Sequence, residues 1–296
     1  MPDPTIFPRT DLALERRRAD LSLPGIGYEE RSEGCFTVTT LTVGDAVSSR
    51  SVGRPIGRYL TVGFPPLGDL TDAERDELVA LLGRTLSSVF PLLPTERKPT
   101  VLVAGLGNRA IVSDAVGPET VGRITATSHL YRDEPRLFAD LGCWSVGTSI
   151  PGVLADTGVE TSEILSGVCR SLRPDFILAI DSLAARSPDR LMTTVQISDT
   201  GIRPGAGIGN ARPALDRSTL GVPVIAVGVP TVVECATLVA DYLTRAGVPD
   251  EDCDTLSEGR DLFYVTPKDV DLSVGRISRM LADVLTSLFS LPCEKR

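Results

Sequence analysis

The sequence has a single histidine, His129, among its 296 residues. Multi-histidine metal sites, HExxH zinc peptidases and most Ser-His-Asp triads need histidines at defined places, so most of these arrangements are excluded. If the protein is an enzyme, its chemistry is expected to use carboxylates. His129 lies at the end of an expected helix, where contact with the last helical carbonyls is the simplest interpretation.

The six cysteines lie far apart and form no CxxC pair. This spacing fits neither a zinc ribbon nor a disulfide scaffold, and it indicates a reducing, cytoplasmic environment. Charged residues, prolines or glycines interrupt every apolar run before it reaches 18 residues. The N-terminus lacks the apolar core of a signal peptide. We therefore expect neither a membrane span nor export by a standard signal.

The chain also lacks an excess of basic residues, since its formal net charge is −9 at pH 7. An acidic protein without a basic stripe is a poor match for the nucleic-acid backbone, so no direct nucleic-acid partner is expected. With 42% hydrophobic and 23% charged residues, the composition is that of a globular protein that can bury a sizeable core.

The N-terminal third differs in pattern from the rest. Residues 1–34 are polar, rich in arginine and interrupted by prolines, which predicts an arm outside the core. The alternating, β-branched stretches 35–43 and 58–63 predict two strands. Acidic residues after Thr71 and an apolar stripe at helical spacing predict a helix over 71–90.

From Thr100 onward, apolar β-rich runs alternate with amphipathic segments, which is typical of a mostly parallel sheet covered by helices. We therefore expect a three-layer α/β core over 99–296, to which residues 35–98 add a small strand and helix unit. The expected strands are 100–104, 143–149, 175–180, 192–197 and 222–228, and the expected helices are 117–129, 160–172, 231–246 and 268–289.

Two aspartates follow apolar strands of this core. Asp181 ends the run DFILAI, and Asp114 lies in the loop after TVLVA, where Gly105 and Gly107 permit a tight turn. Reactive groups in such sheets gather at the carboxyl ends of the strands. If the two strands are neighbours, both carboxylates face one crevice, where two close like charges resist joint ionisation and one aspartate keeps a proton.

Structural roles for the same residues stay open at this point. Asp114 could cap the helix that follows it, and Asp181 could pair with Arg186. The GLGN turn ending at Asn108 lacks the third glycine of a dinucleotide fingerprint. A second glycine-rich run, 198–210, is either a ligand-holding loop or a long connection that needs positive φ.

Several long motifs occur in one order along the chain: VAGLGNRAIVSDAVGP, SIPGVLADTGVETSEILSGV, RPDFILAIDSLAARSPDRLMTTVQISDTGIRPGAGIGN, LGVPVIAVGVPTVV and VTPKDVD. Together they resemble the germination protease family of spore-forming bacteria, the endopeptidases that degrade small acid-soluble spore proteins. The resemblance covers about 100–235 and returns at 265–271. It implies an aspartic endopeptidase that is similar in fold to the hydrogenase-maturation peptidases and needs no cofactor or metal.

The resemblance also implies roles for particular residues. The two essential aspartates of the family match Asp114 and Asp181, with Gly105, Gly107 and Asn108 in the adjoining loop. One carboxylate would activate water, while the other, protonated, would polarise the scissile carbonyl or protonate the leaving amine. A homotetramer acting in the cytoplasm of the forespore or spore core is implied as well.

Members of this family are zymogens that cut themselves at a site resembling the substrate, where an acidic residue precedes a large apolar one. The stretch TDLALE repeats an order of acid, apolar, alanine, any residue and glutamate. We therefore predict cleavage between Asp11 and Leu12, which divides the chain into an 11-residue propeptide, 1–11, and one endopeptidase domain, 12–296. Solvated arm charges are the structural alternative.

Two other functions stay open at this stage. One is a metal-dependent peptidase of the hydrogenase-maturation type. The other is a non-enzymatic α/β module whose glycine-rich loops, 105–108 and 205–210, hold a nucleotide or phosphate.

Overall fold

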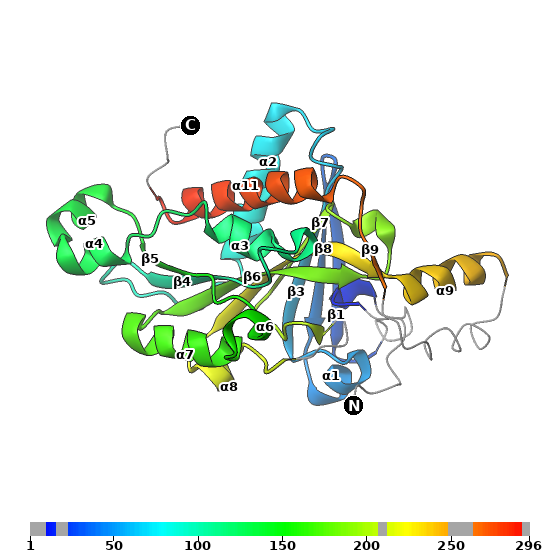
Figure 1. Ribbon diagram of the computed structural model, residues 1–296, viewed down its shortest axis with the longest axis horizontal. Helices are drawn as coiled ribbons and strands as arrows, with labels where there is room; N and C mark the ends of the chain where they lie inside the picture. The colour runs from blue at the N-terminus through cyan, green and yellow to red at the C-terminus, as the bar shows by residue number, and fades with distance from the viewer. Residues whose placement is uncertain (1–9, 16–22, 207–211, 248–262, 292–296) are drawn as a thin grey trace.

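The computed structural model describes residues 10–15, 23–206, 212–247 and 263–291. Within them, nine strands form one sheet in the order β1-β2-β3-β7-β8-β6-β4-β5, with β9 paired to β8 (Figure 1). The strands are β1 (Ile26–Glu33), β2 (Phe36–Val43), β3 (Gly57–Gly63), β4 (Thr100–Gly105), β5 (Ser145–Ser149), β6 (Phe176–Ala185), β7 (Thr194–Ser198), β8 (Val224–Glu234) and β9 (Tyr264–Val265).

The five predicted core strands pair mostly in parallel, with β7 as the exception, but the sheet as a whole is mixed. Strands β5, β4, β6 and β8 pair in parallel, whereas all pairings from β1 through β7 to β8, and that of β8 with β9, are antiparallel. Residues 186–193 between β6 and β7 are too few for a helical crossover, so β7 runs back along β8. The other edge of β7 pairs with β3, and through β3 the N-terminal strands join the sheet.

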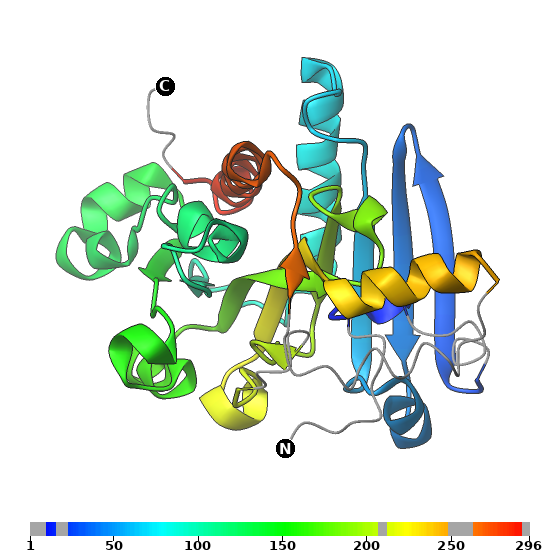
Figure 2. The same ribbon diagram turned by 45° about the vertical axis from the view of Figure 1, so that its right-hand side comes forward.

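Helices cover both faces of the parallel part, which confirms the α/β class and its layered arrangement. Figure 2 shows α2, α3 and α11 on one side of the sheet, with α7 and α8 on the other, and an apolar cluster lies beneath each group. The helices are α1 (Ala46–Val52), α2 (Asp72–Ser87), α3 (Val116–Val121), α4 (Ser128–Asp133), α5 (Pro135–Leu141), α6 (Leu154–Thr157), α7 (Thr161–Leu172), α8 (Arg217–Leu220), α9 (Cys235–Arg245) and α11 (Val270–Leu288).

The described N-terminal residues form more regular structure than predicted. Strands β2 and β3 and helix α2, whose N-cap Thr71 forms a capping box with Glu74, match their predicted positions. However, residues 26–33 form an edge strand, and residues 10–15 dock on the core, so the prediction of an arm over 1–34 was wrong for both. The side chains of β1 are polar and mostly exposed, and its position depends on backbone pairing with β2, which hydrophobic periodicity does not reveal.

The predicted helix over 117–129 is also interrupted. Helix α3 ends at Val121. A few residues later, Thr127 is bound to the strand β5 and the residue before it: its amide donates to the Val146 carbonyl and its hydroxyl to the Trp144 carbonyl. A new helix, α4, then begins at Ser128. His129 therefore lies in the first turn of a helix, and the predicted contact with C-terminal carbonyls was wrong. No helix in the described part of the chain has the length and apolarity needed to cross a bilayer.

Candidate active site

Asp181 lies inside β6 rather than at its end. Strand β4 pairs with β6 only as far as Gly105 and Ile180, but β6 continues to Ala185 along β8. The predicted end of this strand was therefore too early, because the pairing with β8 extends it. Asp181 is only 6% exposed, and Ser182 N–H donates to its Oδ1 at 2.9 Å.

Asp114 reaches the same region from the loop after β4. Its carboxylate Oδ2 accepts a hydrogen bond from Asn108 N–H at 2.8 Å. It ends a short 3-10 turn, and the next helix, α3, begins after Ala115 without a side-chain cap. The alternative in which Asp114 caps this helix is therefore wrong.

Two glycines allow the loop to fold this closely. At Gly107, φ is 107°, and a Cβ placed there would lie 2.1 Å from the Asp114 carbonyl oxygen. At Gly105, a Cβ would lie 2.4 Å from the carbonyl oxygen of Gly117 in α3. A side chain at position 107 would therefore displace Asp114, and a side chain at position 105 would push helix α3 away from the sheet.

The two aspartates affect each other electrostatically. Burial, followed by the charges of Asp114 and Asp11, raises the pKa of Asp181 well above its ordinary value. Burial also raises the pKa of Asp114, against the opposing effect of the hydrogen bond from Asn108 N–H. Asp181 has no guanidinium partner in Arg186, which instead binds Asp241 through both Nε and Nη2 at 2.6–3.1 Å. The alternative of an Asp181–Arg186 ion pair is therefore wrong.

Residues 10–15 bind next to this pair of carboxylates. Asp11 N–H donates to the Ala184 carbonyl at 2.8 Å, and Ala184 N–H donates to Asp11 Oδ2 at 2.9 Å. Leu12 is fully buried in an apolar cluster with Leu183 and neighbouring side chains of β6 and β8. The segment that sequence analysis placed at the cleavage site therefore lies on the strand that carries Asp181.

Gln196 in β7 holds the same segment from the other side. Its Nε2 donates to the Asp11 carbonyl at 3.2 Å, and its Oε1 accepts from Ala13 N–H at 2.7 Å. Gln196 and Asp181 are both register partners of Gly228 in β8, and directly opposed residues emerge on one face of a sheet. Gln196 was not among the predicted site residues, although an amide between two buried apolar residues, Val195 and Ile197, was a usable signal.

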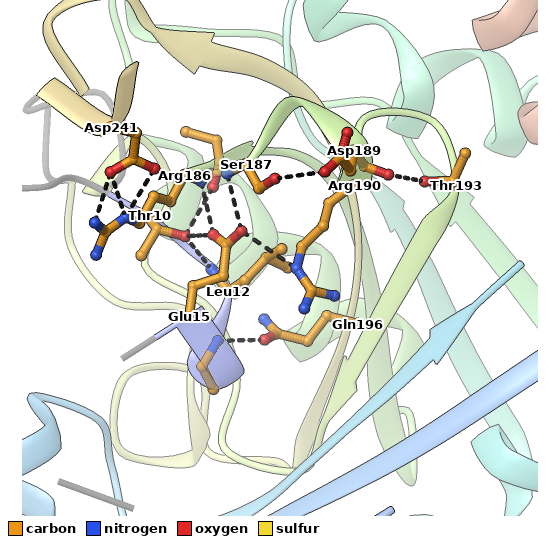
Figure 3. A network of polar contacts seen from close by, with 12 residues as sticks. Thr10, Leu12, Glu15, Arg186, Ser187, Asp189, Arg190, Thr193, Gln196 and Asp241 are labelled. Atoms are coloured by element: carbon orange, nitrogen blue, oxygen red, sulfur yellow. Dashed lines mark hydrogen bonds and ion pairs between the residues drawn. The ribbon is translucent and has the colours of Figure 1, made fainter. Parts of the chain in front are cut away.

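Glu15 anchors the other end of the segment, as Figure 3 shows. Its side chain is 5% exposed and accepts from the backbone N–H groups of Arg186 at 2.7 Å and Ser187 at 3.1 Å. Arg190 Nε lies 3.3 Å from its carboxylate, and the hydroxyl of Thr10 donates to it. Asp11 and Glu15 are thus bound by the core, and the alternative of solvated arm charges is wrong.

The second glycine-rich run and the possibility of a metal site are described only in part. The second glycine-rich run lies only partly within the described residues, which exclude 207–211, and its described part contains a bridge between Ile202 and Leu215. Among the described residues, no group of three or more His, Cys, Asp and Glu side chains is arranged to hold a metal ion.

The comparisons with known proteins all point to one peptidase family. A family model described as germination protease matches residues 9–245, a span that includes both aspartates and the docked segment. A relative from Caldanaerobacter subterraneus subsp. tengcongensis is 42% identical over 238 residues, covering 79% of this chain and 72% of its own. Relatives from Clostridium perfringens and Clostridium tetani are 34% and 36% identical, over 93% of both chains in each case.

All three relatives are named germination protease. The protein is thus an endopeptidase of the aspartic type. The chain belongs to the germination protease family, and its role is that of a protease in spore germination.

Proposed function

We propose that Asp114 and Asp181 are the catalytic pair of a self-processing endopeptidase that starts the degradation of small acid-soluble spore proteins. The observation that carries this proposal is a buried carboxylate with a strongly raised pKa, Asp181, beside a second carboxylate and a docked segment of substrate-like sequence. The family membership supports the substrate class.

The environments of the two carboxylates divide their roles. Asp181 is the more buried and the more strongly shifted, so it holds the proton and donates it to the scissile carbonyl or the leaving amine. Each carboxylate accepts one backbone N–H, so the difference lies in burial and neighbouring charge, and Asp114, whose pKa is less strongly raised, remains the base that takes a proton from the attacking water. The mechanism needs no covalent intermediate.

The bond between Asp11 and Leu12 is the proposed self-cleavage site, so residues 1–11 are a propeptide and residues 12–296 the mature enzyme. The carbonyl of this bond belongs to Asp11, and it accepts from Gln196 Nε2. A donor at that oxygen polarises the carbonyl and stabilises the negative charge that develops on it. Leu12, in its apolar pocket, fills the position of the large apolar residue that follows the acid.

The proposal keeps three further expectations from the sequence. The enzyme acts in the cytoplasm of the forespore or spore core, it assembles as a homotetramer, and its fold is similar to that of the hydrogenase-maturation peptidases. Sedimentation of the purified enzyme would test the assembly, and superposition on such a peptidase would test the fold likeness.

Replacing either aspartate tests the catalytic pair. Asp114→Asn and Asp181→Asn should each abolish cleavage of a TDLALE peptide and loss of residues 1–11, both followed by mass spectrometry. Asp175→Asn, just before β6 and paired with Arg97, is the matched control that should stay active. Wild-type cleavage should continue in a chelator. Robust cleavage by either active-site variant would refute the catalytic pair.

A further inference from the structure

The pocket around Glu15 belongs to the body of the enzyme, not to the propeptide. It is built by the turn after β6, which contains Arg186, Ser187 and a 3-10 turn from Pro188 to Arg190. The Asp189 carbonyl accepts from Thr193 Oγ1 at 2.8 Å, which fixes the end of this turn (Figure 3). The turn therefore presents its donors in a preset arrangement.

The donors in this pocket match a carboxylate. Two backbone N–H groups converge on Glu15, and Arg190 adds a positive charge at the pocket's outer side, where its own side chain is 34% exposed. The guanidinium of Arg186 binds Asp241, so Arg186 serves the pocket through its backbone. A neutral or apolar side chain here would leave buried N–H groups without a charged acceptor.

The bound segment is bent around the proposed scissile bond. Residues Ala13–Glu15 form one 3-10 turn, which brings the Glu15 carboxylate back to the hydroxyl of Thr10 on the other side of that bond. Glu15 thus occupies the acid pocket while Asp11, four positions earlier, is bound to Ala184 on the strand that carries Asp181.

We propose that Arg190 and the backbone amides of Arg186 and Ser187 form a specificity subsite for an acidic side chain. This side chain belongs to the fourth residue after the one that precedes the cleaved bond. This inference rests on the proposed function, since it takes the segment 10–15 as a bound substrate. It assigns to the enzyme's substrates a peptide that carries two acidic residues, one before the bond and one in this subsite, held in a bent shape.

Peptide cleavage by the mature enzyme tests the subsite. Two peptides, TDLALE and TDLALQ with identical flanks, are compared by kcat/KM. We expect wild type to prefer the glutamate peptide by about 10- to 100-fold, the value of charge-assisted hydrogen bonds in a buried site. Arg190→Gln should lower kcat/KM for the glutamate peptide alone, and Arg190→Lys should recover part of the preference.

The matched control is Arg84→Gln, which removes another arginine–glutamate pair, with Glu33, remote in the sequence. It should keep the wild-type preference. Equal cleavage of both peptides by wild type would overturn the subsite while leaving the proposed function standing. Failure to cleave either peptide would overturn the proposed function, and the subsite with it. An unchanged preference in Arg190→Gln would refute the role of Arg190.

Self-processing provides a second measurement, because residues 12–15 of the mature enzyme can compete with added peptide for the subsite. Glu15→Gln and Arg190→Gln should each slow the loss of residues 1–11, and the double variant should be no slower than the slower single one. Additive slowing in the double variant would refute a direct contact.

Discussion

Asp181 on β6 and Glu15 in the docked segment are two carboxylates whose side chains are both largely shielded from solvent but whose surroundings are opposite. Asp181 is 6% exposed, and the side chain of Glu15 is 5% exposed. Asp181 has one backbone N–H donor and feels the negative charges of Asp114 and Asp11. Glu15 has two backbone N–H donors, a hydroxyl donor and Arg190.

The difference shows that burial alone does not assign a role to an acidic residue. Without enough donors, burial favours the protonated acid, which is the form a proton donor in peptide hydrolysis needs. With several donors and a guanidinium, burial favours a charged side chain as a recognition element. In the proposed function, the carboxylate with few donors takes part in the chemistry and the carboxylate with several donors docks the peptide.

The largest effect should come from pH. Because the pKa of Asp181 is raised, kcat/KM should fall about tenfold per pH unit once pH exceeds that pKa, since the proton donor is lost. On the acid side it should fall again as Asp114 becomes protonated.

The profile is measured with both the TDLALE and the TDLALQ peptide. Because both peptides use the same catalytic pair, their two limbs should coincide. A limb seen only with the glutamate peptide would assign that titration to the subsite and break the division of roles. A flat profile would contradict a protonated Asp181.

The side-chain amide of Gln196 binds the backbone of the docked segment on both sides of the proposed scissile bond, at Asp11 and Ala13. Its loss should have the next largest effect. Gln196→Met keeps the length of the side chain but removes the donor to the Asp11 carbonyl. We expect kcat to fall by about 100-fold, as for the loss of one oxyanion donor, with a smaller change in KM. A change confined to KM would show that Gln196 only binds the peptide.

The positions of the two aspartates could be predicted largely from the sequence. Asp114 and Asp181 both follow apolar, β-rich runs, and parallel strands place such residues at one edge of a sheet. The sequence could not show that β6 continues past Asp181, since this depends on pairing with β8. Nor could it show the antiparallel half of the sheet, because strand direction depends on connections and partners and not on the local pattern.

The burial of the docked segment was beyond any local pattern. Leu12 and Glu15 lie in a stretch of mixed charge whose partners, Ala184, Arg186 and Gln196, are more than 170 residues away in the sequence. The family resemblance predicted a cleavage site in this stretch. Only the three-dimensional contacts show that its acidic residues occupy different kinds of environment.

The smallest effect should be on stability, where the two variants should shift the melting temperature in opposite directions. All variants carry Asp114→Asn, so that none is expected to process itself. Adding Asp181→Asn removes a buried acid while keeping an oxygen that can accept from Ser182 N–H, and should raise the melting temperature at pH 7 by about 2 °C or more. Adding Glu15→Gln should lower it by about 2–4 °C, because charge-assisted bonds to Arg190 and two amides are weakened.

The pH dependence fixes the cause of the first change. The pKa of Asp181 is higher in the folded than in the unfolded protein, so its unfavourable contribution grows as pH rises from the ordinary aspartate value, about 3.9. The gain from Asp181→Asn should therefore be present at pH 7 and vanish below that value, as followed by thermal unfolding. Loss of stability at pH 7 in both variants would mean that Asp181 is stabilised as a charge, like Glu15, and the contrast between them would fail.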